Sequence, residues 1–89
     1  MRNDILVLGA GAWGTAIANL LAENCNKKIL LWAFEKKVSD SINNKQINTL
    51  FLPKIKLNKN VLAINNFTGI RPVYIFIVVP SQFVYSIVR

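Results

Sequence analysis

Four short apolar runs, almost without polar interruption, are spaced along the chain. Such runs predict strands that are covered on both faces, as in a parallel sheet. They occupy residues 4–8, 28–33, 61–64 and 73–79. The last run is rich in β-branched and aromatic residues and ends at Pro80, so it is the strongest strand prediction in the chain.

Between these runs the apolar positions recur at helical spacing. Ala16 and Leu20, and likewise Ile17 and Leu21, lie four apart, which predicts a helix over residues 15–24 with these side chains as its apolar stripe. Further helices are expected at 35–45 and from residue 81 onward, and 46–60 is expected to be a loop. The segment at 35–45 is polar with a thin apolar seam at Val38 and Ile42, and Leu52-Pro53 fixes the middle of the loop.

The resulting order, strand, helix, strand, helix, strand, connector, strand, is typical of a parallel α/β sheet. Right-handed crossovers and Rossmann ordering would place the strands in the order 3-2-1-4. We therefore predict an α/β, Rossmann-type doubly wound parallel sheet, incomplete because it holds the first four strands. At 89 residues, the chain is expected to be the N-terminal portion of one dinucleotide-binding domain (1–89), with the substrate and catalytic domain absent.

A glycine-rich turn with the spacing Gly-x-Gly-x-x-Gly follows the first expected strand and opens the first helix. Gly9 would permit the tight turn, Gly11 would let a pyrophosphate approach the backbone, and Gly14 would let the helix pack closely. The helix N-terminus would add free N–H groups and partial positive charge. A plain glycine turn is the alternative interpretation. The expected cofactor-binding residues of the turn are Gly9, Ala10, Gly11, Ala12, Trp13 and Gly14.

Phe34 and Glu35 follow the second expected strand, and each has two possible roles. Glu35 is the only acid near the position at which Rossmann folds bind the ribose hydroxyls, but an acid there could equally cap the next helix. Phe34 could stack on an adenine or close the hydrophobic core. The residues alone do not decide between these alternatives.

The net charge of +7 comes from eleven Lys and Arg against four acids. The lysines are scattered, mostly at element ends and in polar stretches, which favours a solvated basic surface over a nucleic-acid site. The chain has no histidine and one cysteine, Cys25, which we expect to be a buried or half-buried thiol at a helix end. We therefore expect no metal, no nucleic-acid partner and a reducing, cytoplasmic environment.

Two apolar segments could be mistaken for membrane signals. Residues 5–22 follow Arg2 as in a signal peptide, but Asp4 and three glycines interrupt the pattern. Residues 73–79 are far shorter than the roughly 20 needed to span a bilayer. We predict no targeting segment, no transmembrane helix and no membrane partner.

Four motifs, in the same order, resemble those of NAD(P)-dependent glycerol-3-phosphate dehydrogenases. They are Gly-Ala-Gly-Ala-Trp-Gly-Thr-Ala at 9–16, Leu-Trp-Ala-Phe-Glu at 31–35, Asn48 with Phe51-Leu52-Pro53, and Val-Val-Pro-Ser-Gln-Phe at 78–83. The resemblance implies that 9–14 bind the pyrophosphate, that Phe34 contacts the adenosine end and that Phe83 contacts the cofactor past the fourth strand. Family members interconvert glycerol 3-phosphate and dihydroxyacetone phosphate by hydride transfer at the nicotinamide.

The chain departs from this family in several places. Many bacterial members carry an arginine at the position of Phe34, and its absence favours NAD as the cofactor, with NADP as the second option. Asn58 replaces the proline usual after Leu57, and residues 68–72 replace an acidic helix. The family's catalytic lysine and substrate-phosphate ligands lie later in the polypeptide, so we assign no catalytic residue.

Three functions remain. The chain is the cofactor part of a glycerol-3-phosphate dehydrogenase, whose phosphorylated substrate and homodimer would belong to the full-length enzyme. Alternatively, it is a truncated remnant that at most binds a dinucleotide. The third option, another hydride-transfer enzyme such as a hydroxy-acid dehydrogenase, fits poorly with Trp13, Leu52-Pro53 and residues 80–82. In each case the 89-residue chain alone is expected to be catalytically inactive.

Overall fold

The computed structural model describes residues 4–25, 27–69 and 72–77. Its elements are β1 (Asp4–Leu8), α1 (Ala12–Cys25), β2 (Ile29–Trp32), α2 (Lys36–Lys45), β3 (Val61–Ile64) and β4 (Pro72–Ile77). The predicted elements are therefore present in the predicted order. The helix expected from residue 81 lies outside the described residues.

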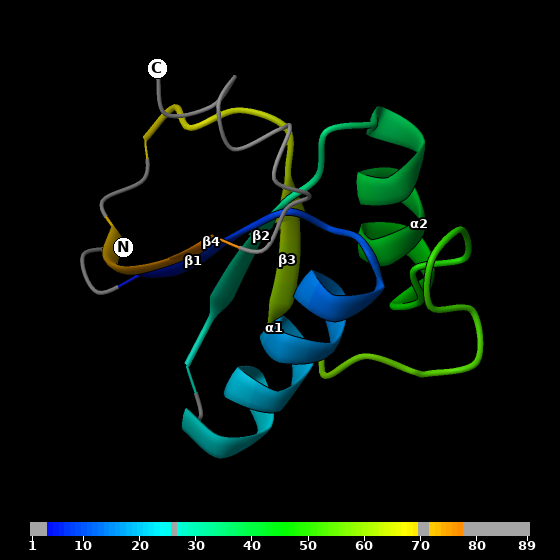
Figure 1. Cartoon of the computed structure of the whole chain (residues 1–89), viewed down its shortest axis with the longest axis horizontal. Helices are drawn as coiled ribbons and strands as arrows, with labels where there is room; N and C mark the ends of the chain where they lie inside the picture. The colour runs from blue at the N-terminus through cyan, green and yellow to red at the C-terminus, as the bar shows by residue number, and fades with distance from the viewer. Residues whose placement is uncertain (1–3, 26, 70–71, 78–89) are drawn as a thin grey trace.

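The four strands are parallel and lie in the order β3-β2-β1-β4, as expected (Figure 1). After β3 the chain returns across the sheet to β4, so the strand order reverses at β1. Ligands of open parallel sheets bind beyond the carboxyl ends of the strands at such a reversal. We therefore expect a ligand-binding site at the carboxyl end of β1, where Leu8 lies opposite Trp32 of β2.

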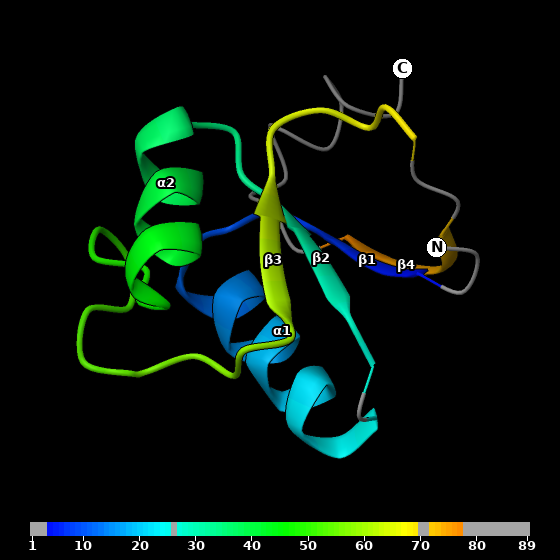
Figure 2. The ribbon, with the colours of Figure 1, turned by 180° about the vertical axis from the view of Figure 1, so that it is seen from behind.

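Figures 1 and 2 place α1 and α2 on the same side of the sheet. The main core lies between these helices and that face of the strands. From the helices it includes Ala18, Ala22, Val38 and Ile42, and from the strands Ile5, Val7, Ile29, Leu31, Val61 and Ala63. The opposite face holds a smaller cluster of Leu6, Leu8 and Leu30, against which Trp32 and Ile64 pack.

Helix α1 packs through its small residues rather than through the stripe that we expected. Its buried side includes Gly14, Ala18 and Ala22, spaced four apart. The predicted pair Ala16 and Leu20 is exposed, and the pair Ile17 and Leu21 is only partly buried. Leu21 packs against the core, but the prediction was wrong for Ala16 and Leu20. The reason is that α1 is apolar over most of its surface, so helical periodicity alone permits more than one stripe. Small residues let the helix lie closer to the sheet.

Strand β4 forms one edge of the described sheet and is poorly covered. Its exposed fractions are 62% for Tyr74, 53% for Ile75, 40% for Phe76 and 48% for Ile77. Successive strand residues point to opposite faces, so both faces of β4 are accessible within the described structure. By contrast, Val7 on the neighbouring strand β1 is 0% exposed.

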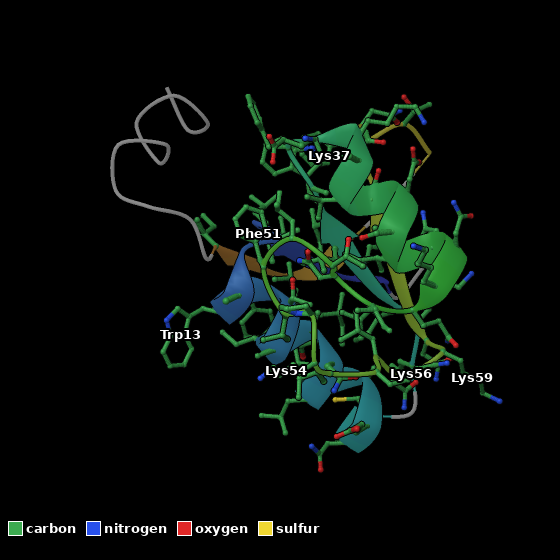
Figure 3. All side chains as sticks on the ribbon, turned by 90° about the vertical axis from the view of Figure 1, so that its right-hand side faces the viewer. Trp13, Lys37, Phe51, Lys54, Lys56 and Lys59 are labelled. Atoms are coloured by element: carbon green, nitrogen blue, oxygen red, sulfur yellow. The ribbon has the colours of Figure 1, made fainter. Side chains whose placement is uncertain are left out.

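The lysine side chains lie on the surface, as predicted. Figure 3 shows several of them along α2 and the loop at 46–60. All eight lysines are exposed: Lys27, Lys28, Lys36, Lys37, Lys45, Lys54, Lys56 and Lys59. Cys25 is also exposed, which corrects the expectation of a buried thiol; as the last residue of α1, it lies beyond the part of the helix that the sheet covers.

Within 4–25, 27–69 and 72–77, no helix is long and apolar enough to cross a membrane. The same residues contain no group of three or more His, Cys, Asp or Glu side chains placed to hold a metal ion.

Candidate functional site

The glycine-rich turn lies at the carboxyl end of β1, where the strand order reverses. Gly9 has a φ of 113°, a conformation that residues with a Cβ rarely adopt. Its N–H donates to the Trp32 carbonyl at 3.1 Å, which joins the turn to the end of β2. Helix α1 then begins at Ala12, earlier than the predicted start at residue 15, so half of the glycine motif is already helical.

Gly11 borders open space. A Cβ added to Gly11 would meet no other heavy atom within 4 Å. Its carbonyl accepts the N–H of Thr15 at 3.0 Å, as part of the first turn of α1. The first N–H groups of a helix have no intrahelical partner and carry partial positive charge. Open space beside such groups is suited to an anion, a phosphate above all.

The last two residues of the glycine motif, Trp13 and Gly14, have different surroundings. Gly14 is buried, in agreement with the close packing predicted for it. Trp13 is 78% exposed, and Figure 3 shows it projecting from the start of α1 away from the body of the molecule. One residue therefore packs the helix, while the indole of the other is accessible to a ligand.

Phe34 does not close the core, because 77% of its surface is exposed. Its ring meets that of Trp32 edge-on, with 6.0 Å between centroids. Trp32 in turn stacks with Phe67 at 5.7 Å and donates its indole N–H to the Asn65 carbonyl at 3.1 Å. Phe34 is thus an exposed aromatic ring with a supporting neighbour at the end of β2.

Glu35 occupies the N-cap position of α2, with an extended backbone and no side-chain cap hydrogen bond. Its backbone carbonyl accepts the N–H groups of Val38 and Ser39 at 3.1 and 3.3 Å. The capping alternative therefore applies to the position of Glu35 and not to its carboxylate. That carboxylate is exposed next to Phe34 in the sequence.

Asn48 is a residue of this region whose role the sequence analysis missed. It is 0% exposed. Its Nδ2 donates to the Ala10 carbonyl at 2.8 Å and to Thr15 Oγ1 at 2.8 Å, while its Oδ1 accepts the N–H of Phe51 at 3.1 Å. One side chain therefore connects the loop at 46–60 to both ends of the glycine-rich turn. Its place in the Asn-x-x-Phe-Leu-Pro motif was visible in the sequence, but its burial was not.

Other hydrogen bonds hold the same loop in place. Gln46 ends α2 in the left-handed conformation, with φ 58°, and its carbonyl accepts the N–H of Leu57 at 2.7 Å. The N–H of Asn58 donates to Asn19 Oδ1 on α1 at 2.7 Å. A proline has no N–H, so the departure from the family pattern at Asn58 adds a tie between the loop and α1.

The structure thus brings most of the predicted site residues to one edge of the sheet. Residues 9–14 follow β1 and Phe34 follows β2, and these two strands are adjacent. Phe83 lies outside the described residues.

The family described as NAD-dependent glycerol-3-phosphate dehydrogenase N-terminus matches residues 4–89. The chain belongs to this family. A relative named glycerol-3-phosphate dehydrogenase (NAD(P)+), from Neorickettsia sennetsu, is 46% identical over 80 residues, which cover 89% of this chain and 24% of the relative.

Solved structures of glycerol-3-phosphate dehydrogenases share this fold. That of Plasmodium falciparum has a TM-score of 0.86 at 27% identity and covers 97% of this chain and 27% of its own. That of Coxiella burnetii has a TM-score of 0.76 at 33% identity and covers 90% of this chain and 25% of its own. The chain therefore spans about a quarter of the length of these glycerol-3-phosphate dehydrogenases. The family match confirms the resemblance carried by the four motifs and decides against a hydroxy-acid dehydrogenase.

Proposed function

We propose that this chain binds NAD as the cofactor part of a glycerol-3-phosphate dehydrogenase, an enzyme that transfers a hydride between NAD(P)H and dihydroxyacetone phosphate or glycerol 3-phosphate. The observation that carries the proposal is the open space at Gly11, at the start of α1 and beside the reversal of strand order. A side chain at this position would meet no protein atom, so the absence of one there is better explained by a ligand that approaches the backbone.

The pyrophosphate and the adenosine end of the dinucleotide have counterparts among the described residues at this edge. The pyrophosphate would lie against residues 9–14, where the helix N-terminus offers N–H donors. The exposed ring of Phe34 would contact the adenosine end, and the exposed carboxylate of Glu35 would accept hydrogen bonds from the ribose hydroxyls. Phe83 would contact the cofactor farther along, after β4. When bound, the dinucleotide supplies the hydride acceptor or donor.

The residues favour NAD over NADP, with NADP as the second option. A 2′-phosphate is held in Rossmann folds by a nearby arginine, and this chain has Phe34 at the position where many bacterial relatives carry one. The Glu35 carboxylate, next to it in the sequence, would repel a second negative charge. The phosphorylated substrate and a homodimer are proposed only for an enzyme that also contains the family's catalytic part.

A second candidate function is dinucleotide binding without catalysis. It is favoured by the length of the chain, about a quarter of that of the relatives it matches. Both functions predict NAD binding, so binding is the first property to test.

Titration of the isotope-labelled chain with NAD and with NADP, followed by NMR, would test the proposal. NAD should shift the amide signals of residues 9–15 and 34–35 at lower concentration than NADP. Phe34→Ala should weaken NAD binding, and Phe34→Arg should raise the relative affinity for NADP. Leu20→Ala, at an exposed site on α1, is the control and should bind like the parent. Unchanged signals at 9–15 at saturating NAD would contradict the proposal.

A further inference from the structure

The hydrogen bonds of Asn48 determine the orientation of its side-chain amide. The Ala10 carbonyl can only accept, so the atom that faces it must be the Nδ2 amide nitrogen. The Phe51 N–H can only donate, so the atom that faces it must be Oδ1. The second Nδ2 hydrogen goes to Thr15 Oγ1. Both N–H groups of this buried amide therefore donate to the glycine-rich turn and the residue that follows it, and its oxygen accepts from its own loop.

This arrangement also orients a peptide group of the turn. The C=O and N–H of a trans peptide point in opposite directions, and the structure contains no cis peptide among the described residues. The Ala10 carbonyl points toward Asn48, in the interior. The N–H of Gly11, which belongs to the same peptide, must therefore point away from Asn48.

The second bond fixes the start of the helix. The Thr15 hydroxyl oxygen accepts a hydrogen bond from Asn48 Nδ2, and the Thr15 N–H donates to the Gly11 carbonyl at 3.0 Å. The carbonyls of Ala10 and Gly11 are thus both engaged within the protein. Carbonyl oxygens would repel a phosphate, so engaging them away from the ligand leaves N–H groups to meet it.

We propose that Asn48 is a positioning residue for the phosphate-binding turn: from the loop at 46–60, it holds the Ala10–Gly11 peptide so that the Gly11 N–H is presented to the pyrophosphate. The inference rests on the proposed NAD binding for its ligand, but the orientation of the turn exists without ligand. The loop is itself tied to α1 through Asn58 and Asn19. Loss of the Asn48 bonds therefore frees the turn while the loop keeps its other attachment.

Asn48→Asp is the sharpest variant, because it keeps the shape of the side chain and replaces its donor by an acceptor that faces the Ala10 carbonyl. Asn43→Asp is the matched control. Asn43 forms a similar pair of bonds with the backbone of Ala63, both 2.9 Å, but it joins α2 to β3, and β2 separates β3 from β1. Both variants lose a hydrogen-bonded amide, and only one of them touches the turn.

The first measurement needs no cofactor. In the free chain, the amides of Gly9 and Thr15 donate to the Trp32 and Gly11 carbonyls. Hydrogen exchange at these two amides, relative to that of the β2 amides, should accelerate by about tenfold or more in Asn48→Asp and stay near the parent ratio in Asn43→Asp. The second measurement is NAD affinity by NMR titration, which should fall by about tenfold or more in Asn48→Asp and less than about twofold in Asn43→Asp.

A pH profile separates positioning from simple packing. A protonated carboxyl can donate one hydrogen bond, and burial raises the pKa of the introduced carboxyl. NAD affinity of Asn48→Asp should therefore rise as the pH is lowered from about 8 to about 5, whereas Asn48→Ala should show no such recovery.

If Asn48→Asp does not fold, Thr15 provides an independent test. Thr15→Val removes the hydroxyl that Asn48 binds at nearly constant volume. It should accelerate exchange at the Gly9 amide, which donates to the Trp32 carbonyl, more than Thr15→Ser, which keeps the hydroxyl. Equal exchange ratios for the Asn48 and Asn43 variants, or for the two Thr15 variants, would overturn the inference. A parent chain that fails to bind NAD, but whose turn loosens in Asn48→Asp, would instead contradict the proposed function and leave the positioning role supported.

Discussion

The N–H of Gly9 donates to the carbonyl of Trp32 at 3.1 Å, so the turn after β1 is joined directly to the last residue of β2. This bond links the two halves of the proposed cofactor site, because Phe34 and Glu35 follow that strand after only one residue, Ala33. The positive φ of Gly9 makes the bond attainable, since the chain can leave β1 sharply without steric conflict.

Gly11→Val should abolish NAD binding while leaving the fold intact. The added methyl groups would enter the open space where the pyrophosphate is proposed to lie, and that space contains no protein atom within 4 Å of an added Cβ. We expect an affinity loss of at least about tenfold, with a thermal midpoint within a few degrees of the parent. Calorimetric titration with NAD, together with a thermal melt, measures both. Ala16→Val, at an exposed position of α1, is the control; a Gly11→Val chain that binds like the parent would place the phosphate site elsewhere.

The 89-residue chain should not oxidise NADH in the presence of dihydroxyacetone phosphate. The reason is that the chain matches only about a quarter of its relatives' length, and the family resemblance implies that the catalytic lysine and the substrate-phosphate ligands lie in the later part. Loss of NADH absorbance, compared with that of a full-length relative under the same conditions, is the measurement. Turnover above the rate without protein would show that the chain carries catalytic groups of its own.

Purified chain should self-associate through β4 as the salt concentration rises. An uncharged, apolar edge strand offers unpaired N–H and C=O groups to other chains, and residues 74–77 are exposed. The net charge of +7 opposes association, but salt at about 0.1 M screens it beyond roughly 10 Å. Sedimentation at low and moderate salt should show a monomer giving way to larger species.

Ile75→Lys should reduce this association, because it places a charge within the exposed strand. Leu20→Lys introduces the same charge at a 59% exposed position on α1 and should associate like the parent.

Each exposed apolar side chain forgoes about 1.5–3 kcal/mol of burial, so we also expect the parent to be only marginally stable. A monomer at both salt concentrations, with a cooperative melt, would show that the β4 edge is protected.

Ala18→Leu should destabilise the fold, since Ala18 is 0% exposed where α1 meets the sheet. Overpacking a filled core costs about 1–3 kcal/mol. Leu20→Ala removes a larger side chain from the opposite side of the helix and should change the free energy of unfolding by less than about 0.5 kcal/mol. Urea denaturation of both variants decides between the observed packing of α1 and the stripe inferred from its periodicity, which predicts the reverse order.

The sequence alone was sufficient for the parallel α/β fold, the strand order and the position of the glycine-rich turn. The reason is that these features depend on local patterns. Unbroken apolar runs indicate strands, the Gly9–Gly14 spacing occurs between a strand and a helix, and right-handed crossovers leave few topologies. The family resemblance rested on motifs of the same local kind.

Only the tertiary structure decided which surfaces these elements use. It buried Ala18 and exposed Leu20, because the separation of helix and sheet, which no local pattern contains, selects the smaller side chains. It likewise buried Asn48, a polar side chain of the loop at 46–60. The partners of that side chain, Ala10 and Thr15, lie more than thirty positions earlier in the chain, and only the folding of α1 and the loop against β1 brings them together.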